Sequence, residues 1–255
     1  MAETIGYLKG AYSFFNPKDF RRDIVAAPVG HIFCALALLN SPSMQIVDKD
    51  AFLVGTSFPD IRYLGGISRT TTHFKGLEGK KLGSGGETSF EAGRRFHVLI
   101  DKKREIFMRK NDAYRFIDEG PLKTQMLKLV EDRILFERLS EKFKPAVIFH
   151  RSYEEEYAYG VSAQSIEKWH DILSNYLDQN YQLHIWRYFT TLLMIKDSIK
   201  ISKDMFSDFF KGVKNVGFLI YAYFKVEELS KDEELRKIIL GFYDDELKNI
   251  INYVK

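Results

Sequence analysis

The sequence predicts an all-α fold, a multi-helix bundle, and three observations support this. Apolar residues recur at helical spacing, as at positions 238, 239, 242, 247, 250, 251 and 254. No stretch shows the strong alternation of apolar and polar residues that is typical of strands. Proline, which breaks helices, occurs six times and not once after Pro145. We expect a single helical domain over residues 1–255.

The elements are expected in the following order. Residues 1–28 are irregular or form short helices, and the apolar run HIFCALALLN gives a helix over 29–40. A second helix covers 48–57, and a long glycine-rich loop covers 58–86. Further helices cover 87–109, 121–144, 161–179, 181–200, 203–224 and 231–254, with Pro121 suited to a first helical turn. Candidate site residues lie within 29–135, so the helices of 145–255 are expected to pack against that part or to bind partners.

Composition and charge narrow the range of functions. With 45% hydrophobic residues, the chain of 255 residues is expected to fold. The net charge of +3 gives no strong nucleic-acid signal. The single cysteine, Cys34, cannot form an internal disulfide, and the N-terminus has no secretory pattern. Apolar runs such as 216–224 are too short to span a bilayer. We expect a soluble cytoplasmic protein whose oligomeric state the sequence does not indicate.

The pair His97 and Asp101, in FHVLID, is the first candidate for chemistry. Four residues are slightly more than one helical turn, so both side chains leave the same helix face and can converge on one ion. Imidazole and carboxylate together suit zinc, iron or manganese. A pair with this spacing is also common at surfaces without any metal.

Three further residues extend the pair, although each has an ordinary structural interpretation. His31 begins an apolar helix, where a histidine often makes a single hydrogen bond in the core. Asp60 follows Pro59 and also suits a turn or a helix cap. His73, in RTTTHF, could be an exposed loop residue. A metal ion would satisfy all of these buried polar groups together.

The order of these motifs resembles the zinc-dependent phospholipase C family, whose all-helical fold is shared with single-strand nucleases. The motifs are GHIFCALALL, GTSFPD, TTHF and FHVLID, and the resemblance covers about residues 29–105. It implies that His73, His97 and Asp101 hold one ion. It also implies that Asp101 bridges to a second ion held by His31, with Asp60 as a ligand or general base.

The sequence also departs from the pattern of that family. The family often uses its N-terminal amine as a ligand, and here thirty residues precede His31. No histidine lies between His97 and His150, although Glu131 and Asp132 on the next predicted helix could replace a missing ligand. We therefore expect one or two ions of zinc, or alternatively of iron or manganese.

The remaining charged residues and histidines have both functional and ordinary structural interpretations. Arg62, Arg69 and Lys75 flank the predicted ligands and could clamp a phosphate, because guanidinium groups bind phosphate through two hydrogen bonds, or they could be solvated loop charges. The acidic run 154–156 is expected to be a solvated face. Three histidines are expected to be structural or at the surface: His150, His170 and His184.

These observations favour a metal-dependent hydrolase of phosphoric esters, a phospholipase C-like phosphodiesterase or phosphatase. The substrate would be a small phosphate ester or a lipid head group, with Asp60, Arg62 and Arg69 as catalytic residues. One alternative is a helical binding protein with a closed, structural metal site that has no position for water. Another is a member of the family that keeps the fold and has lost activity.

Overall fold

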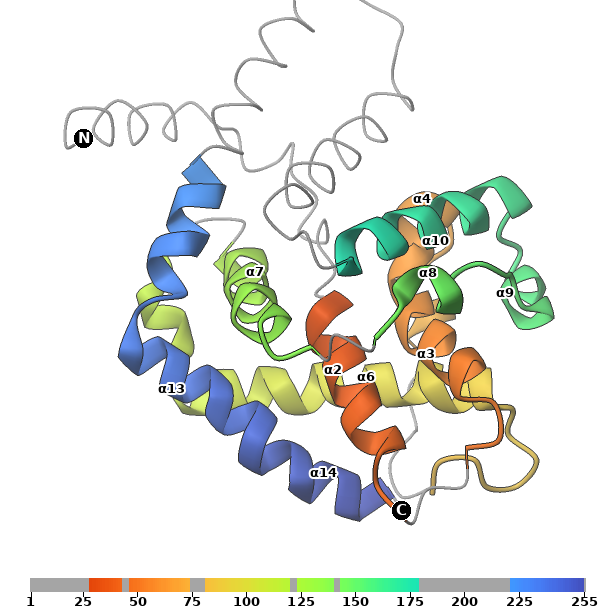
Figure 1. Ribbon diagram of the computed structural model, residues 1–255, viewed down its shortest axis with the longest axis horizontal. Helices are drawn as coiled ribbons and strands as arrows, with labels where there is room; N and C mark the ends of the chain where they lie inside the picture. The colour runs from red at the N-terminus through yellow and green to blue at the C-terminus, as the bar shows by residue number, and fades with distance from the viewer. Residues whose placement is uncertain are drawn as a thin grey trace, which may run out of the picture.

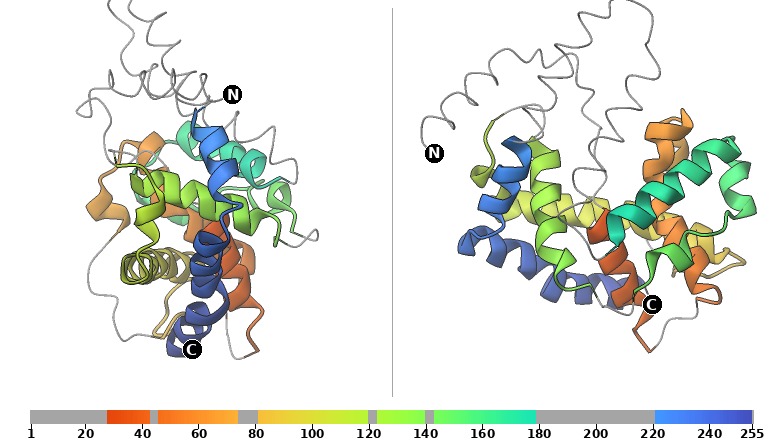
Figure 2. Two further views of the ribbon diagram at one scale, coloured as in Figure 1. Left: turned by 90° about the vertical axis from the view of Figure 1, so that its left-hand side faces the viewer. Right: turned by 45° about the horizontal axis from the view of Figure 1, so that its top comes forward.

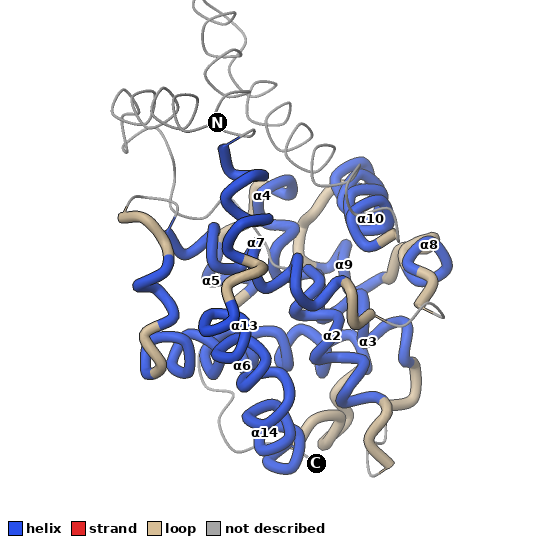
Figure 3. The backbone as a smooth tube through the Cα atoms, turned by 60° about the vertical axis from the view of Figure 1, so that its left-hand side comes forward, coloured by secondary structure: helices blue, strands red, loops and turns tan. Residues whose placement is uncertain are grey.

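The computed structural model describes residues 28–42, 46–73, 81–119, 123–139, 143–178 and 221–254. Within these ranges all regular structure is helical, with no strand, so the predicted all-α class is confirmed (Figure 3). None of the helices in the described ranges is long and apolar enough to cross a membrane.

The elements carry the labels of Figure 1. The first half contains α2 (Pro28–Leu39), α3 (Lys49–Ser57), the 3-10 turn η2 (Phe58–Ile61), α4 (Arg62–Gly65), α5 (Arg69–Thr72), α6 (Ser89–Lys110), η3 (Ala113–Phe116) and α7 (Lys123–Phe136). The second half contains α8 (Pro145–Ile148), α9 (Glu154–Ala158), α10 (Ala163–Leu177), a helix over 221–229, α13 (Glu233–Gly241), the π-helical turn η4 (Phe242–Glu246) and α14 (Leu247–Val254).

The 22-residue helix α6 runs through the middle of the molecule. Helices α2 and α3 pack against it and against each other, and α7 packs on α2 (Figure 1). Helix α10 contacts α2, α4 and α8. Helices α13 and α14 follow each other along one side of the molecule (Figure 2). Helices α2, α3 and α6 therefore form the centre around which the other helices are arranged.

Two glycines allow α3 and α6 to approach each other closely. A Cβ atom at Gly55 would lie 2.1 Å from the Phe90 carbonyl oxygen, and one at Gly93 would lie 2.1 Å from the Phe52 carbonyl oxygen. Any side chain at either position would collide with the backbone of the other helix. The two backbones are thus in direct contact, which fixes the position of one helix on the other.

Side-chain caps define where several helices begin. The Asp48 carboxylate accepts the Ala51 N–H at 2.9 Å at the start of α3, and the Thr88 hydroxyl accepts the Glu91 N–H at 3.3 Å at the start of α6. Such caps satisfy backbone donors that have no partner inside the helix. They account for the agreement between the predicted and observed starts of these two helices.

The prediction of a continuous loop over 58–86 is wrong at its beginning. Residues 58–72 instead form η2, α4 and α5. Pro59 lies in the first turn of η2, where the lack of an N–H group costs no hydrogen bond. The Ser68 hydroxyl caps α5 by accepting the Thr71 N–H at 3.2 Å. Helix α7 also ends earlier than predicted, at Phe136, because Arg138 and Leu139 close a turn on Leu135.

The acidic run 154–156 was expected to be solvated, and for Glu156 this is wrong. Its side chain is fully buried, accepts the Tyr153 N–H at 2.9 Å and lies 2.8 Å from His170 Nε2. His170 is itself buried, which agrees with a structural role, whereas His150 is exposed. The hydrogen bond between Glu156 and His170 gives each of these buried side chains a polar partner.

Several predictions lie outside the described residues. They concern residues 1–27, the helix over 181–200, most of the helix over 203–224, Lys75 and His184. The assignment of residues 1–255 to a single domain also stays a prediction.

Candidate metal centre

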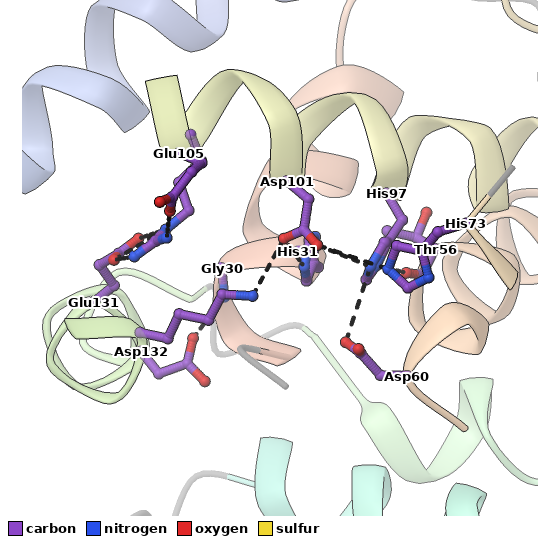
Figure 4. A network of polar contacts seen from close by, with 12 residues as sticks. Gly30, His31, Thr56, Asp60, His73, His97, Asp101, Glu105, Glu131 and Asp132 are labelled. Carbon is purple, nitrogen blue, oxygen red and sulfur yellow. Dashed lines mark hydrogen bonds and ion pairs between the residues drawn. The ribbon is translucent and has the colours of Figure 1, made fainter. Parts of the chain in front are cut away.

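The structure brings the five predicted ligand residues together from four elements. His31 comes from α2, Asp60 from η2, and His73 from the end of α5. His97 and Asp101 project from one face of α6, one turn apart (Figure 4). His97 is fully buried, and the exposed fractions of His31 and Asp60 are only 5% and 7%.

The distances place the Nε2 atom of His97 in the centre of the group. It lies 3.7 Å from Asp101 Oδ2 and 4.0 Å from Asp60 Oδ2. His73 Nε2 lies 3.8 Å from the same Asp101 oxygen, and His31 Nε2 lies 3.4 Å from Asp101 Oδ1. The imidazole of His31 stacks on that of His97, with ring centroids 3.8 Å apart.

A backbone hydrogen bond sets the orientation of the His97 ring. Its Nδ1 lies 2.8 Å from the carbonyl oxygen of Thr56 on α3. A carbonyl can only accept, so Nδ1 carries the proton and the neutral ring keeps its lone pair on Nε2. The close contact of α3 and α6 therefore orients this imidazole toward the two carboxylates.

His73 is oriented in a similar way by its neighbour. The hydroxyl of Thr72 donates to the Arg69 carbonyl at 3.3 Å and lies 2.9 Å from His73 Nδ1. A hydroxyl that donates its one proton to the Arg69 carbonyl can accept the Nδ1–H of His73, and in that tautomer Nε2 again keeps the lone pair. The guanidinium of Arg94 donates to the carbonyls of Thr71 and Thr72 at 3.2 and 3.3 Å, which ties α5 to α6.

Burial keeps the central imidazole neutral. Complete burial, followed by the neighbouring ring of His31, lowers the pKa of His97 well below its ordinary value, although Asp101 acts in the opposite direction. A metal binds only the neutral form of a histidine. His97 is therefore in the protonation state of a ligand at neutral pH.

Asp101 is held in its ionised form. Partial burial opposes ionisation, but Lys128 on α7 and then His31 and His73 outweigh it, and the pKa of Asp101 is well below its usual range. The Nζ atom of Lys128 lies 3.3 Å from Asp101 Oδ1. One oxygen of this carboxylate thus faces Lys128 and His31, and the other faces His73 and His97.

The five residues fit a metal ion on two counts. In the described part of the chain, the buried Nε2 atoms of His73 and His97 have no hydrogen-bond partner. Their distances of 3.7 to 4.0 Å to carboxylate oxygens exceed hydrogen-bond length. Ligands held about 2.1 Å from one tetrahedral ion lie roughly 3.4 Å apart, close to these separations.

Two overlapping groups within the five could hold an ion. One consists of His31, Asp60 and His97, and the other of His73, His97 and Asp101. In each group the ligand atoms lie within 4.8 Å of one another. Both groups contain His97.

Glu131 and Asp132, which the sequence left open as replacement ligands, have other partners. Glu131 accepts hydrogen bonds from Arg104 Nε at 2.8 Å and from Tyr243 at 2.9 Å. Asp132 accepts the Gly30 N–H at 2.9 Å and the Tyr176 hydroxyl at 3.1 Å. Both side chains are fully buried, and they connect α7 to the helices around the centre instead of entering it.

The predicted phosphate clamps lie on the two short helices of the site. Arg62 begins α4, two residues after Asp60, and is partly buried, whereas Arg69 begins α5 and is exposed. Their role toward a substrate stays a prediction.

Sequence reasoning missed four residues that support the ligands: Thr56, Thr72, Arg94 and Lys128. The signal for Thr72 was available, because a hydroxyl directly before a predicted histidine ligand can reach its ring. Arg94 precedes His97 by three residues on α6, so its position on the same side of the helix could also have been inferred. Thr56 acts through its carbonyl and Lys128 comes from another helix, so neither leaves a local pattern.

Comparison with models of protein families, with curated proteins and with solved structures gives no match.

Proposed function

We propose that this protein is a metal-dependent hydrolase of phosphoric esters, a phospholipase C-like phosphodiesterase or phosphatase. One observation carries the proposal: three imidazoles and two carboxylates from four helical elements converge, and the inward Nε2 atoms of His73 and His97 lack hydrogen-bond partners among the described residues. Buried polar groups normally have partners, and a divalent cation would supply one to all of them.

The residues have distinct roles in this proposal. His73, His97 and Asp101 would hold zinc, or alternatively iron or manganese, with His31 and Asp60 beside them. A bound cation supplies Lewis acidity, which makes water a better nucleophile and neutralises phosphate charge. Asp60, 4.0 Å from His97 Nε2, would either complete the ligand set or accept the proton of the attacking water. Arg62 and Arg69 would hold the phosphate oxygens of a small ester or lipid head group.

The burial of the ligands favours one second candidate, a closed structural metal site in a binding protein. His97 is fully buried, and Asp101, the more exposed of the two carboxylates, exposes only 17% of its side chain. Five donors are enough to saturate one ion, which would then have no position for water. This candidate predicts tight metal uptake without hydrolysis.

The test combines metal content with turnover. The purified chain is loaded with Zn²⁺, Mn²⁺ or Fe²⁺, its metal is measured by elemental analysis, and p-nitrophenol release is followed from mono- and diester substrates. The proposal expects bound metal and hydrolysis that are both lost in H97A and D101N. Bound metal without turnover on a broad ester panel, lipid head groups included, would favour the structural site. Absence of bound metal would refute both.

A further inference from the structure

Lys128 lies beside Asp101, the carboxylate that would bridge two metal ions if the family resemblance holds. Its Nζ atom lies 3.3 Å from Asp101 Oδ1, and His31 Nε2 lies 3.4 Å from the same oxygen. A second ion bridged by Asp101 and bound by His31 would have to lie beside this oxygen. The ammonium group carries a full positive charge and, with its three N–H donors, cannot be a ligand itself. It therefore repels a cation from that position.

Among the residues that the structure describes, those near this oxygen do not offer a second ligand set. Lys128 is followed on α7 by the carboxylates of Glu131 and Asp132, and each of these is engaged elsewhere by hydrogen bonds of 2.8 to 3.1 Å. In the described ranges, both groups capable of holding a metal include His97. The Nδ1 of this histidine bonds Thr56, so only the Nε2 lone pair is available, and it can bind only one ion.

We propose that Lys128 is a positioning residue that takes the place of a second metal ion, so that the centre holds a single ion. The lysine then neutralises the outer oxygen of Asp101, while the inner oxygen faces His73 and His97. This inference rests on the proposed function for its metal centre, but it makes a separate claim about the number of ions. Where the sequence left one or two ions open, this inference predicts one.

The test is the number of Mn²⁺ ions bound per chain at saturation, measured by equilibrium dialysis. The wild-type protein and K128R should each bind one ion, with the Mn²⁺ spin-resonance spectrum of an isolated ion. K128E removes the ammonium and adds a ligand beside Asp101 and His31, so it should bind two ions. K123E, on the same helix and with the same change of net charge, should still bind one.

The outcomes separate this inference from the proposed function. Two ions in the wild-type protein would overturn the role of Lys128 and leave the metal centre standing. A single ion in K128E would overturn it as well. If K128E does not fold, as judged by circular dichroism, K128Q is measured instead. It should then bind two ions, and a single ion would overturn the role of Lys128. No bound ion in the wild-type protein would refute the metal centre and this inference together.

Discussion

At the scale of single residues, the orientation of two imidazoles depends on their outer nitrogens. His97 Nδ1 is 2.8 Å from a backbone carbonyl, and His73 Nδ1 is 2.9 Å from the Thr72 hydroxyl. Such outer hydrogen bonds fix the tautomer and the direction of a ligand, and losing one typically weakens metal affinity about 10- to 100-fold. The hydroxyl is the one of these two acceptors that mutation can remove.

The substitution T72V is therefore expected to weaken Zn²⁺ binding by about 10- to 100-fold, because His73 loses the acceptor for its Nδ1–H. Valine has nearly the same shape, so the fold should persist. The matched control is T70V, since the Thr70 hydroxyl is exposed and bonds Ser68. Competitive titration against a chelating dye measures the Zn²⁺ affinity of T72V and of T70V. Equal affinities in T72V and the wild-type protein would contradict the role of Thr72.

The substitution D60N separates the two roles of Asp60. If its carboxylate accepts the proton of the attacking water, hydrolysis should fall by about 10²- to 10⁴-fold while metal content stays close to that of the wild-type protein. A parallel loss of activity and metal would make Asp60 a ligand instead. Metal analysis and p-nitrophenyl ester turnover on the same preparation distinguish these results.

At the scale of elements, two interhelical contacts position the centre. The glycine contact joins α3 to α6 and brings the Thr56 carbonyl to His97, one turn beyond Gly93. The second contact joins α7 to α2, where Asp132 Oδ1 accepts the N–H of Gly30, the residue before His31. A disturbance of either contact should reach the ligands without any ligand being changed.

The substitution G93A is expected to destabilise the protein by about 1–3 kcal/mol or more, because the new methyl group has no space against the Phe52 carbonyl. It should also reduce metal uptake, since His97 moves with α6. The control is G241A, because a Cβ there lies in ordinary contact, 3.6 Å from Phe107, and alanine favours a helix. Denaturant unfolding gives the free energy of unfolding of G93A and of G241A, each relative to the wild-type protein. A G93A protein as stable as G241A would contradict the close helix contact.

Asp132 gives a pH dependence of stability. Burial raises its pKa to about 8, although the Gly30 N–H and Tyr176 oppose the change. In the unfolded chain an aspartate titrates near about 3.9. Between these values the folded state holds a proton that the unfolded state has released. This contribution to stability is therefore present in full at low pH and is lost as pH rises toward 8.

We therefore expect D132N, which cannot ionise, to gain stability relative to the wild-type protein between pH 5 and pH 8. The gain should be at least about 1.4 kcal/mol, which corresponds to one pKa unit. Urea unfolding of D132N and of the wild-type protein at pH 5 and at pH 8 measures this difference in free energy of unfolding. D244N, which changes a partly exposed aspartate paired with Arg138, is the control and should show no such trend. A constant difference between D132N and the wild-type protein would show that Asp132 is ionised throughout.

At the scale of the whole molecule, the helical class and the long helices of the first half followed from apolar periodicity and end signals. Helix α6 begins within two residues of its predicted start, and there the Thr88 side chain caps it. The short helices of 58–72 were missed because single turns have no periodicity to detect. The candidate site residues were named from motif order, whereas Thr56 and Lys128 depend on tertiary contacts that no local pattern records.

Because the five candidate ligands come from four elements, a bound ion should stabilise the whole fold. At a metal concentration one hundred times the dissociation constant, the gain is about 2.7 kcal/mol. For a chain of this size, that corresponds to a rise in Tm of about 5–10 °C. A thermal melt with Zn²⁺ and then with excess chelator should show this shift and its reversal. H97A should show neither, and an equal shift in H97A would place the ion elsewhere.

The contact between the Thr56 carbonyl and His97 has a consequence for sequence variation and for protein engineering. The atom that fixes this imidazole belongs to the main chain, so other residues that fit the buried space at position 56, such as serine, alanine or valine, would also present it. What must be preserved is the course of the backbone, which the two glycines secure. Variation at position 56 should therefore be tolerated by the centre far better than the addition of one methyl group at Gly55 or Gly93, although neither glycine touches a ligand atom.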